Sequence, residues 1–205
     1  MRFVGDQLVA LLVAVSFAAG LNLYATVATL GLLSHFEVLT LPGSLHVLGN
    51  WWVIGVSAAL FVVEFFADKI PGFDLVWNAL HTFIRVPAAA LLAYQATSSL
   101  SPMQQMAATA AGGAIALVAH GGKTAARAAV TPSPEPISNA ALSMGEDTLS
   151  IFITWLAAHH PYIAASIVAV LLVVTILLVR WVWRSLRSLF RKGTQTFEGM
   201  IKGAQ

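Results

Sequence analysis

The sequence predicts an all-α integral membrane protein, a single bundle of about six transmembrane helices. Of its 205 residues, 58% are hydrophobic and 10% are charged, whereas soluble domains are about 45–50% apolar. The mean hydropathy is +0.80. Several apolar runs approach the length of about 20 residues that a helix needs to cross the hydrocarbon core. The first expected partner is therefore the lipid bilayer.

The composition also excludes several classes of protein. The chain has no cysteine, which rules out disulfides and thiol catalysis. The net charge of +2 gives no reason to expect a nucleic-acid partner. No motif requires a metal or a cofactor, so we expect neither.

Residues 7–34 form the first apolar segment, which is long for one crossing. The stretch AAGLNLYAT places Gly20 and Asn22 near its middle. Glycine lets helices approach closely, and an asparagine in an apolar medium needs a hydrogen-bond partner. We expect either a helix that is broken here or a helix with a packing notch at Gly20.

Five further apolar segments follow, at about 50–68, 75–98, 103–127, 138–158 and 162–184. Proline and glycine separate them, because both residues interrupt helices. The breaks are LPGS at 41–44, IPGF at 70–73, SSLSP at 98–102, TPSPEPIS at 131–138 and HHP at 159–161. We expect one transmembrane domain over residues 1–185 and a basic amphipathic cytoplasmic tail over residues 186–205.

The basic residues predict the orientation of this bundle. With six crossings, all eleven lysines and arginines fall on or near one side, and the loops at 35–49, 99–102 and 159–161 contain none. Lysine and arginine concentrate on the cytoplasmic side of membrane proteins. We therefore expect a multi-pass protein with both termini in the cytoplasm.

Two short motifs recur along the chain. AAG occurs at 18–20 and at 110–112, and AAL precedes Glu64 and Glu146 at identical spacing. Two halves of three helices each would have inverted topology, which is common in secondary transporters. The alternative is a chance match in an alanine-rich chain.

Ionisable side chains recur at helical spacing near the expected cytoplasmic ends of four segments. Residues 64 and 68 are four apart, as are residues 123 and 127, so each pair shares a helix face. A charge at the bilayer centre costs about 2.5–3.5 kcal/mol, so such groups turn inward and pair. We expect an internal charged cluster open to the cytoplasm. Its candidate ion- or substrate-binding residues are Asn22, Glu64, Asp68, Asp74, His81, Arg85, His120, Lys123, Arg127, Asn139, Glu146 and Asp147.

The expected pairing within this cluster is specific. The carboxylates at 64 and 68 should lie near the cations at 123 and 127, and those at 146 and 147 should lie near Arg85 or His81. The simpler alternative is that the charges form structural ion pairs, or that those close to helix ends extend to the lipid headgroups.

The C-terminal region has a separate character. Arg180, Arg184, Arg187 and Arg191 form one helical stripe with tryptophans beside it. Such a stripe is typical of the cytoplasmic interface and favours anionic lipid headgroups as partners. The sequence is also compatible with a homo-oligomer.

Four stretches resemble a known family. GLNLYATVATLGLL, VEFFADKIPGFDLVWNALHTFIRVPA, HGGKTAARAAV and SNAALSMGEDTL are similar to the bacterial membrane family called domain of unknown function 4126. The resemblance covers about residues 9–185, and the proline-rich loop at 131–137 departs from the more glycine-rich loop of other members. It implies a small polytopic protein of the bacterial inner membrane and brings no established activity.

The cluster favours a small transporter or flippase-like protein for an anionic substrate, with phosphate-bearing and lipid molecules among the candidates. Arg85, Lys123 and Arg127 would bind the anion. The carboxylates would supply counter-charge and, in a proton-coupled process, the titrating group, with His81 or His120 as a relay. The alternatives are a scaffold or assembly protein and a cation channel or carrier. An enzyme is not expected, because no nucleophile stands beside the carboxylates.

Overall fold

The computed structural model describes residues 5–70, 73–130 and 136–203, and these residues form helices and short connections without a strand. The first four helices are α1 (Gly5–Leu21), α2 (Leu23–His35), the short 3-10 helix η1 (Gly43–Gly49) and α3 (Trp51–Ala67). They are followed by α4 (Phe73–Ala96), α5 (Pro102–Val130), α6 (Pro136–His159) and α7 (Pro161–Gly203). The all-α prediction is confirmed, the expected segments at 50–68, 75–98, 103–127 and 138–158 overlap α3 to α6, and the last one, at 162–184, is shorter than α7.

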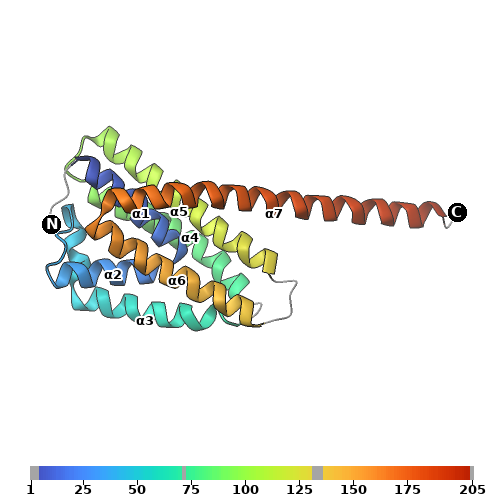
Figure 1. Cartoon of the computed structure of the whole chain (residues 1–205), viewed down its shortest axis with the longest axis horizontal. Coiled ribbons are helices and arrows are strands. Elements are labelled where there is room, and N and C mark those ends of the chain that lie inside the picture. Colours follow the sequence, from blue (N-terminus) through green and yellow to red (C-terminus); the bar gives the residue numbers. More distant parts are fainter. Residues whose placement is uncertain (1–4, 71–72, 131–135, 204–205) are drawn as a thin grey trace.

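Successive helices from α3 to α7 run in opposite directions along the bundle (Figure 1). Two stretches, Val76–Ala96 in α4 and Pro161–Ser185 in α7, are long and apolar enough to cross a membrane. Helix α7 continues through the expected tail and projects beyond the other helices (Figure 1).

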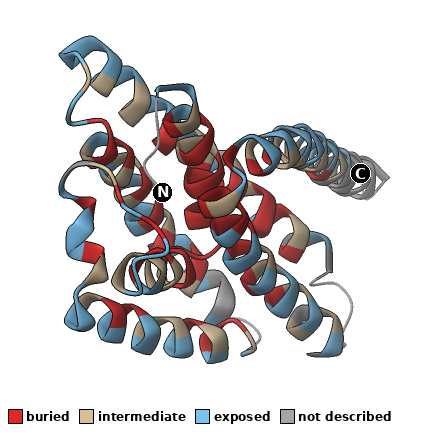
Figure 2. Cartoon of the chain, turned by 60° about the vertical axis from the view of Figure 1, so that its left-hand side comes forward, coloured by how far each residue is buried: buried red, intermediate tan, exposed pale blue. Residues whose placement is uncertain are grey.

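Helix α1 is the central helix of the bundle. Every residue from Ala14 to Leu21 is buried, because α1 packs against α4, α5, α6 and α7. Figure 2 shows the same arrangement, with buried residues gathered at the centre and exposed residues on the outer faces of the surrounding helices.

The first expected segment is broken at Asn22, which separates α1 from α2. Asn22 has extended backbone angles (φ −145°, ψ 104°), and its side-chain oxygen accepts a hydrogen bond from the Ala25 N–H at 2.9 Å. Asn22 is therefore the N-cap of α2, a role that asparagine fills well. One extended residue is enough to redirect the chain, and α2 turns back alongside α1 (Figure 1).

Both free ends of the α1–α2 hairpin lie at the same end of the bundle. The Tyr162 hydroxyl, at the start of α7, donates to Asp6 at 2.6 Å. The His35 ring, at the end of α2, bonds the Gly49 carbonyl just before α3 at 2.9 Å. We call this end, which also holds residues 97–101 and 160, the loop end; the opposite end, where α3 finishes at Ala67, is the charged end.

The expected six crossings with both termini on one side are therefore wrong. The described chain begins at the loop end and α7 leaves from the charged end, so its two ends lie on opposite sides of the bundle (Figure 1). The prediction failed because apolar length does not reveal a reversal of direction. The predicted cytoplasmic location of the N-terminus depended on Arg2 alone, and Arg2 lies outside the described residues.

An inverted repeat is also not what the structure shows for the two AAG motifs. Their helices, α1 and α5, run parallel: Ser16 lies against Gly112, and Gly20 lies against Ala116. An inverted repeat requires the matched helices to be antiparallel. The packing-notch interpretation of Gly20 holds together with the break, because a Cβ on Gly20 would lie 2.5 Å from the Ala116 carbonyl oxygen.

Candidate functional site

Lys123 lies at the centre of a buried ion network at the charged end. Its Nζ is 2.8 Å from Asp68 Oδ2, 3.3 Å from Glu64 Oε1 and 3.4 Å from Glu146 Oε2. It also lies 3.4 Å from the Leu21 carbonyl at the end of α1. Lys123 thus joins side chains of α3 and α6 to the point where the α1–α2 hairpin turns.

Arg127 extends the network one helical turn further along α5. Its Nη2 lies 2.9 Å from both Asp68 Oδ2 and Glu146 Oε2, and its Nη1 donates to the Asp68 carbonyl at 3.2 Å. Spacing of four residues places Lys123 and Arg127 on one face of α5, and Glu64 and Asp68 on one face of α3. The two faces therefore meet as two interlocked pairs.

Arg85 closes the network from α4. Its guanidinium pairs with Glu64, and its Nη1 lies 3.0 Å from His120 Nδ1. Because arginine can only donate, Nδ1 of His120 is the acceptor and the proton of this neutral ring is on Nε2. Nε2 then lies 2.8 Å from the Thr82 hydroxyl and 3.1 Å from the Asn78 carbonyl.

Burial of these ionic groups is close to complete. The side chains of Glu64, Asp68, Arg85 and Lys123 are 0% exposed, and that of Arg127 is 1% exposed. Glu146 differs, with a side chain that is 11% exposed. Within the described network, Glu146 is therefore the member that reaches the surface.

Asp147 lies beside the helix break. The Asn22 amide nitrogen donates to Asp147 Oδ1 at 2.8 Å. Asp147 Oδ2 is buried without a hydrogen-bond partner, and within the described residues no lysine or arginine lies within salt-bridge distance of it. The Ser150 hydroxyl supports the same turn through the carbonyls of Ala18 and Asn22, each at 3.1 Å.

His81 is buried but does not join the ion network. Its Nδ1 bonds the Trp77 carbonyl at 2.8 Å, and its Nε2 bonds the Tyr24 hydroxyl at 3.2 Å. A carbonyl can only accept, so Nδ1 carries the proton and Nε2 accepts from Tyr24. This pair ties α4 to the start of α2.

The expected pairing is confirmed in one half and wrong in the other. The carboxylates of α3 do pair with the cations of α5. Glu146 contacts the α5 cations instead of Arg85 or His81, because Arg85 is already engaged by Glu64. Asp147 contacts Asn22. The side chains of Asp74 and Asn139 lie outside the described residues.

The family description "Domain of unknown function (DUF4126)" matches residues 9–181, which include every residue of this network. The chain belongs to the DUF4126 family. No curated protein matches the sequence. No solved structure matches it either. DUF4126 is a family of unknown function, so membership names no reaction or substrate for this chain. The side chains of the site are what indicate its chemistry.

Several polar residues of the DUF4126 site were not singled out from the sequence. Tyr24, Thr82 and Ser150 each bond a candidate residue or the helix break. The available signal was spacing: Ser150 is one turn beyond Glu146, and Tyr24 follows Asn22. Spacing within one helix does not identify the hydrogen-bond partner, because each of these side chains bonds a residue outside its own helix.

Among the described side chains of the DUF4126 site, the carboxylates of Glu64, Asp68 and Glu146 pair with Arg85, Lys123 and Arg127. Asp147 makes no ion pair with these cations, and the ammonium of Lys69 on the same end of the bundle acts on it electrostatically. These four carboxylates and four cations balance, and Asp147 is the carboxylate that lies outside the ion pairs. Across the part of the chain that the structure describes, no group of three or more histidines and carboxylates is arranged to hold a metal.

Proposed function

We propose that this protein is a small membrane transporter, flippase-like in mechanism, that moves an anionic substrate across the membrane. The movement is coupled to a proton that a buried carboxylate gains and loses. Three features support the proposal: the apolar exterior of the bundle, the carboxylate of Asp147 at a broken helix, which makes no ion pair, and the two α5 cations beside the surface residue Glu146.

The distribution of side chains supports a bundle embedded in lipid. Large apolar residues face outward, with Trp52 83% exposed and Phe83 81% exposed. Charged residues face inward, with Glu64 and Arg85 0% exposed. Water would favour the opposite arrangement, because exposed apolar patches are unfavourable and buried charges are expensive. A hydrocarbon surrounding favours the arrangement observed.

Asp147 is the observation that carries the proposed coupling. An ionised carboxylate that makes no ion pair is costly in a buried site, and taking up a proton removes that cost. Asp147 lies against the break between α1 and α2. Discontinuous helices of this kind hold the coupling ions of many transporters. We assign to Asp147 the proton that is gained and lost in each cycle.

Lys123 and Arg127 are the proposed anion site. Arginine presents a planar fork of donors that suits phosphate and carboxylate, and lysine adds a compact positive charge. Their present ligand from α6 is Glu146. A substrate anion could take the place of that carboxylate without leaving either cation unpaired.

A scaffold is the second candidate, and one observation favours it. The network joins α3, α4, α5 and α6 through ion pairs, so it could act only to hold these helices together. In that case Asp147 would carry no proton in a cycle, and the protein would move nothing across the membrane.

The test is proton movement in proteoliposomes with a pH-sensitive dye inside and anionic lipid in both leaflets. After a pH step, we expect the wild-type protein to dissipate the gradient at least tenfold faster than empty vesicles. Asp147→Asn, which mimics the protonated form, should lose this acceleration while its melting temperature stays close to that of the wild type. Asp6→Asn, the same change at the loop end, should keep it.

Two results would contradict the proposed function. If the wild-type protein leaves the gradient as empty vesicles do, the scaffold is favoured. If Asp147→Asn folds and still carries protons as the wild type does, Asp147 is not the coupling residue.

A further inference from the structure

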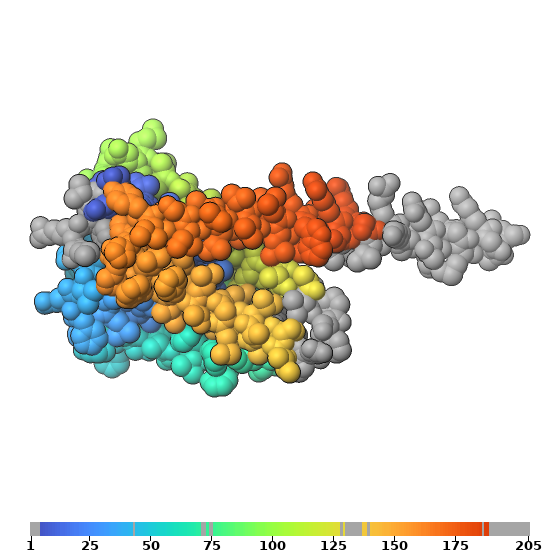
Figure 3. All heavy atoms as spheres, in the orientation of Figure 1, coloured from blue at the N-terminus to red at the C-terminus, as the bar shows by residue number. Residues whose placement is uncertain are grey.

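A groove of about 510 Å³ opens at the surface beside the ion network. It is lined by Leu21 at the end of α1 and by the α6 residues Leu142, Gly145, Glu146 and Leu149, among others. It exists because α6 packs closely on α1 but only sparsely on α5. Figure 3 shows the consequence, with the yellow-green end of α5 visible between α6 and α7.

Apart from Ser138, the lining of the groove is apolar and is charged at one point. That point is Glu146, whose carboxylate bridges Lys123 at 3.4 Å and Arg127 at 2.9 Å. The cations lie directly behind it and are 0% and 1% exposed. An anion that entered the groove would therefore meet two buried cations as soon as Glu146 moved aside.

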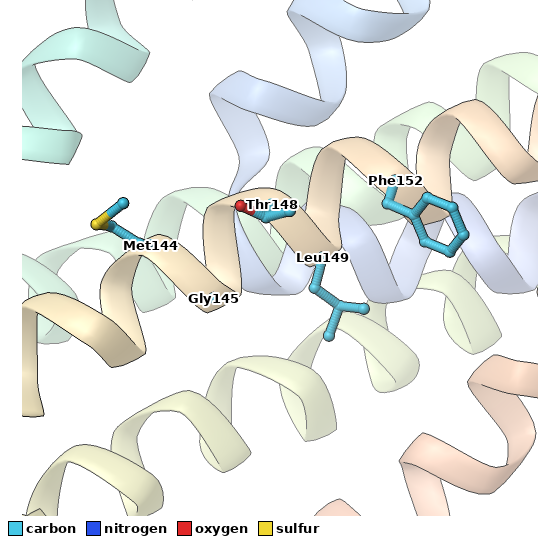
Figure 4. A pocket seen from close by; sticks show the side chains of 5 residues that line it. All are labelled: Met144, Gly145, Thr148, Leu149 and Phe152. Atoms are coloured by element: carbon cyan, nitrogen blue, oxygen red, sulfur yellow. The ribbon is translucent and has the colours of Figure 1, made fainter.

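The apolar surface continues away from Glu146 along α6. A second hollow, of about 410 Å³, shares Gly145 and Leu149 with the first and extends to Phe152. Figure 4 shows its side chains, with Leu149 directed toward α5. From Gly145 to Phe152 the helix rises by about 10 Å, at about 1.5 Å per residue. The two hollows thus form a mainly apolar track along α6 between Ser138 and Phe152, with Glu146 as its charged point.

We infer that this track binds a lipid with a phosphate headgroup, whose phosphate replaces the Glu146 carboxylate on Lys123 and Arg127 and whose chain follows α6. The inference rests on the proposed function and names its substrate class. The contacts fit because a phosphate in place of the Glu146 carboxylate can accept from both Lys123 and Arg127, which stay paired with Asp68. The shape fits because the groove opens sideways, toward the place where lipid chains would lie.

The first experiment compares three probes on the full chain in a neutral detergent. Phosphatidic acid should raise the melting temperature and bind saturably. Diacylglycerol, which lacks the phosphate, and inorganic phosphate, which lacks the chain, should bind at least tenfold more weakly. Equal binding of diacylglycerol would mean that the groove recognises chains alone, and equal binding of inorganic phosphate would mean that it recognises a free anion. Either result would overturn the inference.

Matched variants locate the binding. A Cβ on Gly145 or on Gly55 would meet no atom within 4 Å, so Gly145→Leu and Gly55→Leu should both fold. Only Gly145 lines the groove. We expect Gly145→Leu to weaken phosphatidic acid binding at least tenfold and Gly55→Leu to leave it unchanged. Equal affinities in the two variants would place the lipid elsewhere.

Glu146→Gln should change the affinity for phosphatidic acid in the opposite direction. Removing the competing negative charge should strengthen phosphatidic acid binding about tenfold, whereas a binding mode that leaves Glu146 on its cations would be weakened or unaffected. Binding is measured without a pH gradient, so the two proposals fail separately. Lipid binding without proton movement would leave this inference standing and remove the transporter. Proton movement without lipid binding would do the reverse.

Discussion

At the scale of single residues, Lys123 holds the largest number of opposing charges in the site. Three carboxylates lie within 3.4 Å of its Nζ. Removing one partner of a buried ion pair costs far more stability than replacing both partners by apolar residues, because the remaining charge stays desolvated. Lys123 therefore has a structural role whatever the site binds.

Lys123→Met should destabilise the protein by about 3–5 kcal/mol, because it leaves the three carboxylates of Glu64, Asp68 and Glu146 with only Arg85 and Arg127 to pair with. The measurement is thermal unfolding in detergent. Arg180→Met is the control, since Arg180 is exposed on α7 and forms no ion pair with a described carboxylate. A melting temperature for Lys123→Met within the range of the control would show that the carboxylates are already protonated or solvated.

At the scale of helices, the close contact of α1 with α5 decides where the helix break lies. Gly20 permits this contact, because no side chain separates it from the Ala116 backbone. Two residues later the chain turns at Asn22, whose side chain caps α2 and bonds Asp147. The notch and the break are thus parts of one feature.

Gly20→Ala should destabilise the protein by about 1–3 kcal/mol, since overpacking forces the two helices apart. The matched control is Gly121→Ala on α5, where a Cβ meets no atom within 4 Å. There alanine should stabilise by about 0.5–1 kcal/mol, because it is the better helix former. Both are measured by thermal unfolding, and equal effects of the two substitutions would show that α1 does not pack on α5 through Gly20.

At the scale of the whole molecule, the α1–α2 hairpin sets which side each terminus occupies. The start of α1 contacts the start of α7, whereas α7 itself runs out past the charged end (Figure 1). For a bundle embedded in a membrane, we predict from this arrangement five crossing helices and one hairpin that enters and leaves on the same side.

Single cysteines introduced into this cysteine-free chain test the arrangement with an impermeant thiol reagent in intact cells. We expect Asp6→Cys to label together with Ser101→Cys and His160→Cys, and Ser188→Cys to be protected, because basic residues stay on the cytoplasmic side. Lysed cells supply the control, in which all four should label. Labelling of positions 6 and 188 from the same side would contradict the hairpin.

The helical class, the ends of α3 to α6 to within a few residues and the faces that carry charge could all be predicted from the sequence, whereas the end of α7 could not. Each of these depends on composition and on spacing within one helix, so the pairs at 64 and 68 and at 123 and 127 could be recognised as shared faces. The reversal at Asn22 and the partner of each charge become evident only in the packed helices. Lys123 and Asp68 are 55 residues apart, and Asn22 and Asp147 are 125 apart. Such contacts depend on which helices become neighbours, and packing at Gly20 and the turn at Asn22 set that choice.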